Sequence, residues 1–485
     1  MLNLSFVAQR WLLACAWLPI VLLSACAPVI PASHLPATMQ KHATPASSPA
    51  AQAAGVPVGI PSREWWRDLG DSRLDALVQQ AQANNHDARA ALASLQAARA
   101  QADAAARESL PQGSLAAHAQ LQRPSLIEVD PYRQGLPRPP QQRIASVTQG
   151  LGWEIDLFGR IDTATGVAQR RADVAAAELH AALALLQAEV AGHYIQLRQQ
   201  QALIEYQIEA LRMGNLHATQ LAAREMAGLV DRREVLEAER LQTSRETEYM
   251  QMLANEQAHL AALAVLTGHS PISPPADWLN MLAAAPLPDP PTGLFLNRPD
   301  DLLMRRPDVR RADALLRAQL GEAVLAERAH LPHLRLEMSA GLNAPFGTLG
   351  EAGALRYALG PVLQWDWLDS GRNQARSEAA RAGADAAWHD FEQTVLKALQ
   401  DSESALWQWN VAQSAFASAH LSEQLAQRNA SYADTRTKAG LEPPQASLHQ
   451  SLLLLEARKG LKTAEADRLL AFAKVQLAMG AWAPR

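Results

Sequence analysis

The sequence predicts a mixed α and β membrane protein that is assembled from two copies of one structural unit. The first observation is that four short segments alternate apolar and polar residues, as strands with one apolar face do. The second is that the stretch from Gly159 to Pro271 is rich in alanine and contains no proline before its end, which is typical of very long helices. The third is that several motifs recur along the chain at one fixed spacing.

Length and composition exclude several classes of protein. The chain has 485 residues, of which 48% are apolar but only 5% aromatic. Alanine supplies much of the apolar share, which favours long, closely packed helices over the compact core of an enzyme. The net charge is −5 and no basic stripe with interleaved aromatic residues occurs, so we predict no nucleic-acid partner. Without a GxxxxGK(S/T) phosphate loop or a convergent catalytic set, we predict no enzymatic activity, no catalytic residues and no cofactor.

The N-terminal residues are typical of a bacterial lipoprotein signal. A short apolar run ends at Leu23-Ser24-Ala25-Cys26, which resembles a lipobox. We therefore predict a signal peptide over residues 1–25, lipidation of Cys26, and a Pro/Ala/Ser-rich tether over residues 26–60. The alternative is an ordinary signal peptide with an incidental cysteine. The only other cysteine, Cys15, lies within the signal, so if Cys26 is lipidated no thiol remains for a disulfide or a metal site.

The second half of the chain repeats the order of the first. Three pairs of motifs share a spacing of 212 residues and one pair shares 221: Gly159-Arg160 with Gly371-Arg372, Ala227-Gly228-Leu229 with Ala439-Gly440-Leu441, Leu266-Thr267-Gly268 with Ala478-Met479-Gly480, and Leu110-Pro111 with Leu331-Pro332. This series indicates a tandem duplication in which the first copy has the longer loop between Pro111 and Gly159. The repeats are predicted over 61–270 and 300–485. The linker between them, 271–299, holds eight prolines and is predicted to be largely non-helical.

Each repeat is predicted to contain a helix of about 25 residues, two strands, a very long helix, a short turn and a return helix. The first helices are predicted over Asn85–Ser109 and Pro307–His330, and the strands over about 113–123, 144–158, 333–343 and 355–368. The long helices start at the strand-to-helix junctions Gly159-Arg160 and Gly371-Arg372, and the return helices span Asp231–Thr267 and Gln445–Met479. Pro361 would delete a ladder hydrogen bond, so we predict a bulge in the fourth strand.

The alternating segments fit a membrane β-barrel. They are close to the roughly 9–11 residues that a transmembrane strand needs, and Trp153, Trp365 and Trp367 lie near the strand ends, where aromatic girdles occur. The alternative is a soluble antiparallel sheet with one buried face. Four strands cannot enclose a lumen, because even about eight leave room only for side chains. If these strands form a pore, several chains must contribute to it.

The long helices then extend far from the membrane. Arg160 to Gly228 would span roughly 100 Å at 1.5 Å per residue, and the helix that starts at Arg372 and reaches Glu442 is similar. Because the return helices are shorter, the 25-residue helices are predicted to stack end to end with them. The alternative is a soluble coiled coil, which the directly fused strands argue against.

Nearly the whole mature chain resembles the TolC-like outer-membrane factor family, specifically the NodT-type lipoproteins of drug-efflux pumps. The matching segments are EWWRDLGDSRLDALV (64–78), ANNHDARAA (83–91), GWEIDLFGRI (152–161), LTG (266–268), DLLMRRPDVRRADALL (301–316) and MGAW (479–482). The resemblance implies a homotrimer that forms a 12-stranded outer-membrane barrel, continuous with a periplasmic helical barrel. It also implies a periplasmic adaptor and an inner-membrane transporter of the resistance–nodulation–division class as partners, and contact with outer-membrane lipid.

The candidate working residues lie in the two helix-hairpin turns. The resemblance implies an acidic gate near Glu442, and Asp231 holds a comparable place in the first turn; three copies of either would form an acidic ring. The alternative for each is a turn carboxylate that caps the next helix, which is at least as well supported for Asp231. Gly228 and Gly440 are predicted to be left-handed. The turns depart from the family at Glu225 and Thr437, where an aromatic residue is usual, and at the two prolines of GLEPPQ (440–445).

Two further motifs are weighed as sites. His330-Leu331-Pro332-His333 lacks reinforcing ligands, so surface histidines are favoured over a metal site and no metal is predicted. The run from Arg305 to Asp308 is a possible recognition patch, but a helix start with flanking charges is favoured.

The leading functional hypothesis is a passive outer-membrane exit duct for drugs or other small solutes. A periplasmic adaptor or structural coiled-coil lipoprotein is the alternative from another class, although no lipoyl-like β-domain is visible between the helices. A protein-secretion duct is the alternative within the first class. The expected location is the outer membrane, where the chain is lipid-anchored and membrane-spanning with its helices in the periplasm.

Overall fold

The computed structural model describes residues 64–129, 131, 132, 134, 135, 137, 140–288 and 305–481. They form two compact units. The sheet unit contains Gln96–Asp173 and Asp313–His389, and the hairpin unit contains the described residues within 64–95, 174–312 and 390–481. The predicted signal peptide, the lipidated Cys26 and the tether lie outside the described residues, so those features stay predictions.

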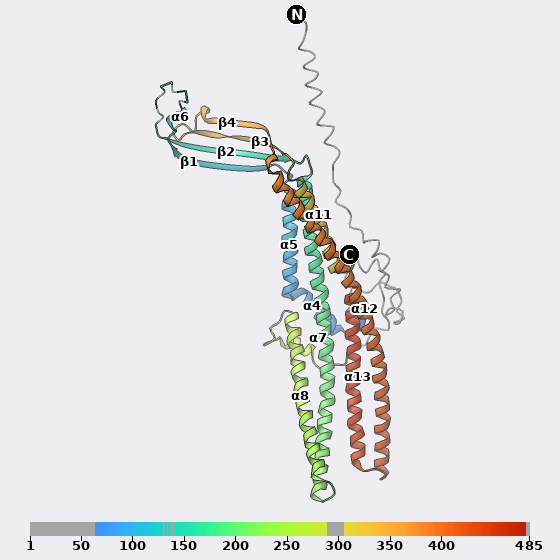
Figure 1. Cartoon of the computed structure of the whole chain (residues 1–485). Helices are drawn as coiled ribbons and strands as arrows, with labels where there is room; N and C mark the ends of the chain where they lie inside the picture. Colours follow the sequence, from blue (N-terminus) through green and yellow to red (C-terminus); the bar gives the residue numbers. More distant parts are fainter. Residues whose placement is uncertain are drawn as a thin grey trace. The chain divides into compact units, whose positions relative to one another are not determined.

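The sheet unit holds one four-stranded antiparallel sheet, to which each repeat contributes two strands. The strands are β1 (Gln112–Gln122), β2 (Gln142–Ile155), β3 (His333–Pro345) and β4 (Leu355–Gln364). They lie side by side in the order β1-β2-β3-β4, so the pairing of β2 with β3 joins the two repeats (Figure 1). The hairpin β1–β2 carries a short helix, α6 (Leu126–Val129), in its loop, and a 3₁₀ turn, η4 (Ala352–Ala354), precedes β4.

The fourth strand differs from its prediction in two ways. It ends at Gln364 rather than near 368, because Trp367–Asp369 form a 3₁₀ turn, η5, that leads into the next helix. The predicted bulge at Pro361 is also wrong. Leu336 pairs with Pro361 and Arg335 with Val362, one residue against one. Within this chain β4 is an edge strand, where a missing N–H is tolerated without extra residues.

The register of the sheet gathers the apolar side chains on one face. One row across the strands consists of Ala117, Val147, Leu342 and Leu355, and another consists of Gly113, Leu151, Met338 and Leu359. This face is not covered by the described part of the chain: Leu115 is 75% exposed and Leu359 is 68% exposed. A soluble sheet would bury such a face. The structure therefore favours the membrane interpretation over the soluble one.

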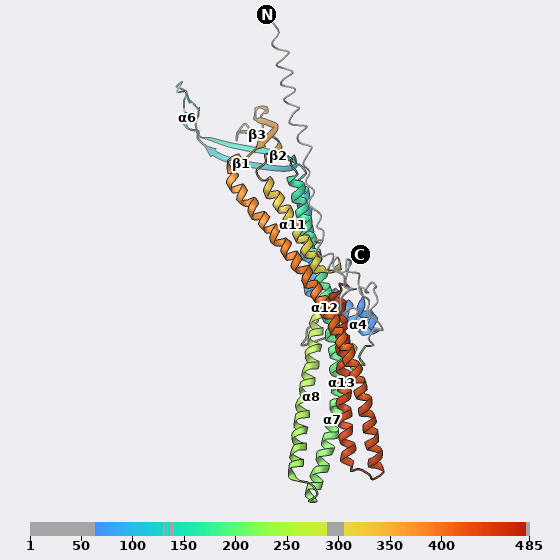
Figure 2. The same ribbon diagram turned by 45° about the vertical axis from the view of Figure 1, so that its right-hand side comes forward.

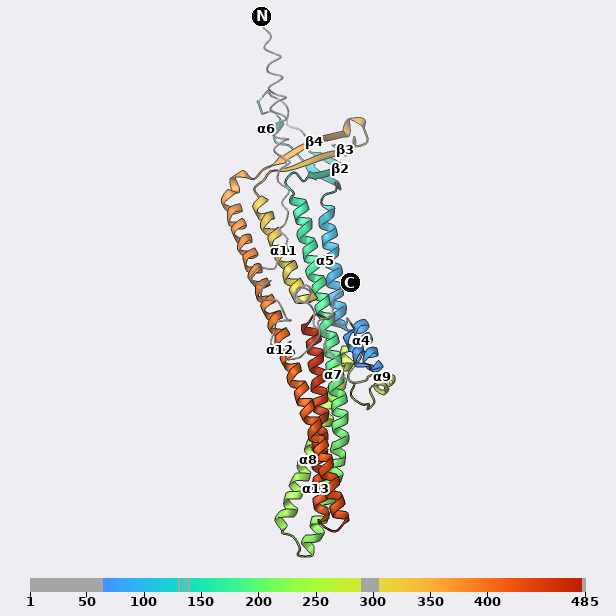
Figure 3. The ribbon, with the colours of Figure 1, turned by 90° about the vertical axis from the view of Figure 1, so that its right-hand side faces the viewer.

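Six helices carry the rest of the two repeats: α5 (His86–Arg107), α7 (Arg160–Met226), α8 (Arg232–Leu266), α11 (Pro307–Arg328), α12 (Ser370–Lys438) and α13 (Pro444–Ala478). In the hairpin unit each long helix is followed by an antiparallel return helix (Figure 2). In the sheet unit, segments of α5, α7, α11 and α12 run side by side below the strands (Figure 3). There Arg171 of α7 binds Glu322 of α11, and Arg381 of α12 binds Glu327 of α11 at 2.7 Å.

The element boundaries reproduce the internal duplication. A shift of 221 residues carries α5 onto α11, and a shift of 212 carries α8 onto α13, with both ends of each helix matched. The same shifts carry the pair Ser114 and Gly150 onto the pair Arg335 and Val362, so the two strand hairpins share one register. The extra residues of the first repeat therefore lie in the loop between β1 and β2.

The core of the hairpin unit surrounds the first described elements of the chain. The 3₁₀ turn η3 (Trp65–Leu69) and α4 (Ser72–Asn84) bury Trp65, Trp66 and Leu77 against the middle of α7 and the end of α13. Trp65 packs edge-on against Phe472, with ring centroids 6.0 Å apart. α7 is the one described helix long and apolar enough to cross a membrane by composition. Leu186, Val190 and Tyr194 of this helix belong to the core of the hairpin unit.

The linker between the repeats is partly helical and is anchored to α7. Residues 276–281 form α9, and Trp278 within it is buried. Arg198, whose side chain is fully buried, donates to the carbonyl oxygen of Ala283 at 2.6 Å and to that of Leu282 at 3.2 Å. The described part of the linker is therefore largely non-helical, as predicted. A buried arginine, which no motif indicated, binds the linker to α7.

Candidate functional site

The turn of the first helix hairpin, between α7 and α8, has the predicted left-handed glycine. Gly228 has a φ of 72°, and the amide of Leu229 donates to the carbonyl oxygen of Arg224 at 2.9 Å. This is a Schellman-type helix end, which needs a residue without a Cβ. Asp231 then caps α8, because its side chain accepts a hydrogen bond from the amide of Arg233 at 2.8 Å. The capping interpretation of Asp231 is confirmed.

The turn of the second hairpin, between α12 and α13, has the same backbone but a different cap. Gly440 also has a φ of 72°, and the amide of Leu441 donates to the carbonyl oxygen of Arg436 at 2.9 Å. The position equivalent to Asp231 is Pro443, which offers no side-chain acceptor. Pro444 follows at the start of the helix, where it removes a donor that would otherwise need a cap. The two prolines therefore replace an aspartate cap.

Glu442 does not cap α13. Its carboxylate accepts a hydrogen bond from Nε of Arg436 at 2.6 Å, so it is held against the last turn of α12. The first turn has a corresponding ion pair between Arg232 and Glu225, at 3.1 Å. Glu225 stands where the family usually has an aromatic residue, and its charge is balanced by this arginine. The pair in the first turn therefore bridges α7 and α8, whereas the pair in the second turn ties the turn residue Glu442 to α12 alone.

Apolar side chains are exposed next to these ion pairs. Met226 is 90% exposed, Leu229 67% and Leu441 66%. Leu229 and Leu441 are equivalent under the 212-residue shift. Both turns therefore expose a leucine at the same place.

Replacing Asp231 by alanine should loosen the start of α8 alone. The hydrogen bond from the Arg233 side chain, followed by that from its amide, lowers the pKa of Asp231. A lowered pKa means that the carboxylate stabilises the folded turn at neutral pH and that this contribution is lost as the pH falls through the lowered value. The protection of the amides of 232–235, which is their exchange rate relative to that of an unstructured chain at the same pH, should fall in D231A and, in the parent, at acid pH. The amides of 445–448, capped without an aspartate, serve as the control; an equal loss of protection there would contradict the prediction.

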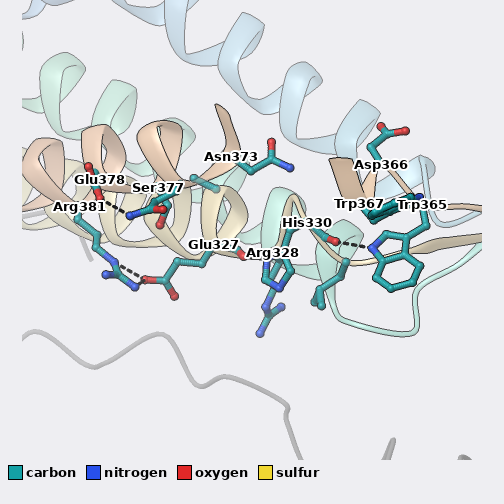
Figure 4. Close-up of a pocket in the computed structure, with 13 residues that line it drawn as sticks. Glu327, Arg328, His330, Trp365, Asp366, Trp367, Asn373, Ser377, Glu378 and Arg381 are labelled. Atoms are coloured by element: carbon teal, nitrogen blue, oxygen red, sulfur yellow. Dashed lines mark hydrogen bonds and ion pairs between the residues drawn. The ribbon is translucent and has the colours of Figure 1, made fainter. Parts of the chain in front are cut away.

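The strand-to-helix junctions of the two repeats share one tryptophan contact. Nε1 of Trp153 donates to the carbonyl oxygen of Ser109 at 2.9 Å, and Nε1 of Trp365 donates to that of His330 at 3.0 Å (Figure 4). The shifts of 212 and 221 carry the first pair onto the second. These indoles tie the end of the first helix of each repeat to the strand that leads into its long helix.

The junction glycines are less alike than the sequence suggested. Gly159 is left-handed, with a φ of 69°, and precedes α7 directly, whereas Gly371 lies within the first turn of α12 and has no positive φ. The equivalence predicted for these glycines therefore does not extend to backbone conformation. The physical reason is that η5 leads directly into α12 at Ser370, so Gly371 already has helical backbone. The arginines keep comparable roles: Arg160 binds Glu154 at 2.9 Å, and Arg372 binds Asp369.

A pocket of about 670 Å³ lies at the second junction (Figure 4). Its wall combines the end of α11, the connection from β4 and the first turns of α12. Three carboxylates line it, Glu327, Asp366 and Glu378, against two guanidinium groups, Arg328 and Arg381. His330 is among the lining residues and His333 contacts Glu154 at 3.6 Å. No group of three or more metal-ligating side chains occurs among the described residues.

In each repeat, a buried polar residue joins the start of the first helix to the end of the return helix. Nδ2 of Asn85, before α5, donates to the carbonyl oxygen of Leu266 at the end of α8, at 3.2 Å. Its equivalent, Arg306, precedes α11 and donates to the carbonyl oxygen of Ala478 at the end of α13, at 3.0 Å. Arg306 also binds Asp308 at 2.7 Å and Asp401 at 3.0 Å. These contacts join the first and return helices end to end, as predicted, and they give Arg306 of the arginine run a structural role.

A second buried cation was not indicated by any motif. Lys459 of α13, whose side chain is 8% exposed, binds Gln207 of α7 and Glu456, and lies 3.4 Å from Glu248 of α8. It therefore joins the second hairpin to the first. In the sequence, a lysine within a helix is indistinguishable from a surface residue. Its burial depends on contacts with residues far away in the chain.

These features define a class. A four-stranded sheet with an exposed apolar face, fused to long helical hairpins in a duplicated chain, is the subunit of an outer-membrane channel. The chain belongs to the outer membrane efflux protein family, whose model matches residues 77–269 and 299–481. The two matches correspond to the two repeats, and membership places the protein in the outer membrane.

Relatives and solved structures agree with this assignment. The chain is 30% identical to the fusaric acid resistance protein FusA of Burkholderia cepacia over 69% of its length and 62% of that protein's length. It is 29% identical to the pyoverdine export outer membrane protein OpmQ of Pseudomonas aeruginosa, over 88% of both chains. The solved outer-membrane channel OprN superposes with a TM-score of 0.80 at 25% identity, covering 94% of this chain and all of that one. The Campylobacter jejuni channel CmeC, at 20% identity and a TM-score of 0.79 over 88% of this chain and 89% of that one, has the same fold.

Proposed function

We propose that three copies of this chain form the outer-membrane exit duct of a tripartite efflux system for small solutes. One observation carries the proposal: the sheet exposes its apolar face and leaves β1 and β4 as edges, with no partner among the described residues. Unpaired edges at membrane depth are not stable, and four strands do not enclose a lumen. Pooling the strands of several copies resolves both problems, and channels of this class are trimers.

The partners we propose are a periplasmic adaptor and an inner-membrane transporter of the resistance–nodulation–division class. Two observations support a docking role for the hairpin turns: the exposed apolar residues Leu229 and Leu441, and their repetition in both turns. The strands of the described residues all belong to one sheet, so a second β-domain of the kind an adaptor carries does not occur there. The relatives are named for resistance to fusaric acid and for export of pyoverdine, and we extend this to small solutes.

Two measurements test the proposal. The purified protein should have the mass of a trimer in detergent and should conduct ions in planar bilayers. A strain lacking the gene should become sensitive to compounds that the intact strain exports, and the sensitivity should disappear when the gene is restored. A monomeric mass, or trimers without conductance under any applied voltage, would contradict the proposed duct.

We also propose that Glu442 forms an acidic ring at the periplasmic end of the duct. Glu442→Gln should lower the preference of the open channel for cations, on the order of twofold, because three charges at one level raise the local cation concentration. The measurement is the reversal potential in a KCl gradient. The control is Asp434→Asn, which removes an exposed carboxylate of α12 that pairs with Lys438. Equal shifts in the two variants would show that Glu442 has no special position.

A further inference from the structure

One charged side chain lies on the apolar face of the sheet. Arg143 of β2 is in phase with Val147, because side chains on the same face of a strand are two residues apart. It lies opposite Leu121 of β1, and the amide of Phe346, directly after β3, donates to its carbonyl oxygen at 2.8 Å. Leu121 and Phe346 are both exposed, and so is Arg143 between them. The guanidinium of Arg143 has no hydrogen bond or ion pair with another residue that the structure describes.

Arg143 lies at the end of the sheet that is remote from the periplasm. Trp153, on the same face of the same strand, marks the other end, where the chain continues into α7. The ten residues between them span about 33 Å along the strand, and a tilt of about 40° reduces this to about 25 Å across the membrane. That is the height of the apolar band of an outer-membrane barrel. Because the helices are periplasmic, Arg143 lies at the cell-surface interface, next to the hairpin loop that carries α6 (Figure 1).

The second repeat has a leucine in place of this arginine. The shifts of 221 and 212 residues carry Leu121 and Arg143 onto Leu342 and Leu355, which lie opposite each other in β3 and β4. The fold therefore accepts an apolar side chain at this position and does not need the charge. A charge on the lipid face is costly at the centre of the membrane but costs little at its interfaces. The role of Arg143 therefore lies in a contact outside the described chain.

The chemistry of the outer interface indicates what this contact is. The outer leaflet of a bacterial outer membrane consists of lipopolysaccharide, whose lipid A carries phosphate groups between its acyl chains and its outer sugars. A guanidinium donates charge-assisted, bidentate hydrogen bonds to phosphate. A second guanidinium is close by, because the exposed Arg123 directly follows Gln122, which pairs with Gln142. Leu121 and Phe346 offer apolar surface to the acyl chains of the same lipid.

We propose that Arg143, with Arg123 beside it, binds a phosphate group of lipid A on the outside of the barrel, while Leu121 and Phe346 contact the acyl chains. The site is separate from the proposed duct, because Arg143 lies on the face turned away from the lumen. The inference rests on the outer-membrane location of the sheet and not on transport. A protein that failed to conduct would contradict the duct and leave the lipid site intact.

Binding of fluorescent lipid A to the delipidated protein in detergent tests the site. R143L should raise the apparent Kd on the order of tenfold, because charged hydrogen bonds to phosphate are lost. R143L is expected to fold, since leucine stands at the equivalent position of the second repeat, and R143Q should weaken binding to the same extent. The matched control is R356L, the same substitution on the polar face of β4, which should bind like the parent. Unchanged binding in R143L and R143Q, or equal weakening in R356L, would overturn the proposal.

The choice of lipid tests the ligand. The parent should bind lipid A that has both phosphates on the order of tenfold more tightly than lipid A without phosphates, and R123L/R143L should bind the two alike. A preference that survived in this double variant would contradict the role of the arginines. Phosphatidylglycerol, an anionic phospholipid, should compete only weakly with lipid A. If it competed as well as unlabelled lipid A does, the assignment to lipopolysaccharide would be wrong.

Discussion

Replacing Arg306 by alanine is expected to lower the free energy of unfolding of the hairpin unit by about 3 kcal/mol. The guanidinium is buried and donates to the carbonyl oxygens of Ala398, at 3.3 Å, and Ala478, at 3.0 Å. Burial alone would lower the pKa of Arg306, but its contacts with Asp308 and Asp401 outweigh this and raise it. The side chain therefore stays charged. Alanine would remove a charged donor from two carbonyl oxygens that would keep only Oγ of Ser402 as a side-chain donor, and from the carboxylates of Asp308 and Asp401.

The measurement is chemical unfolding of the helices followed by circular dichroism, together with hydrogen exchange at the start of α11. Arg305→Ala is the matched control, since it removes a neighbouring arginine that is less deeply buried. Arg306→Lys should fall between the two, because a lysine keeps the charge but cannot bind several acceptors with a planar fork. If R306A and R305A unfolded alike, the structural role of Arg306 would be wrong.

Replacing Gly341 by valine is expected to abolish assembly of the sheet. A Cβ built on Gly341 of β3 would clash with the carbonyl oxygen of Val147 and would lie 2.7 Å from Cα of Thr148. Both atoms are backbone of β2, so no side chain can move aside to make room. The strands would have to separate, and the pairing of β2 with β3 is the link between the repeats within the sheet. We expect the variant to yield no folded trimer in outer membranes.

Gly360 supplies the control for this experiment. It lies on the same polar face, in β4, and a Cβ there would meet nothing within 4 Å. G360V should therefore assemble like the parent, as judged by the amount of native trimer resistant to mild detergent. Loss of assembly in both variants would show that any branched residue on this face is harmful, and not the close approach at Gly341.

The two substitutions test contacts in different parts of the fold, one in the sheet and one between helices. Gly341 permits a close approach of two strands from different repeats, and Arg306 closes a stack of two helices from the second repeat. Both act where segments distant in sequence meet. They concern the assembly of the chain rather than the proposed docking at the hairpin turns, since neither residue lies there.

Much of the fold could be predicted from the sequence because it depends on local order. Alternation with a period of two identifies strands wherever one face is apolar. The register shows that the alternating apolar residues do lie on one face of the sheet. Left-handed glycines follow from local backbone geometry, so Gly228 and Gly440 were predictable. The Asp231 cap was predictable for the same reason, because a cap depends on residues two or three positions away.

The sequence by itself therefore determined the duplication, the four strands, the long hairpins and their turns, since each depends on spacing along the chain. Tertiary structure alone decided the roles of Arg306, Arg198 and Lys459, because burial of a charge depends on partners 80 to 250 residues away. It also decided that Pro361 needs no bulge and that Gly371 lies inside a helix. The physical reason is that a local pattern constrains the backbone of its own segment, whereas a side chain's partners are set by how distant segments pack.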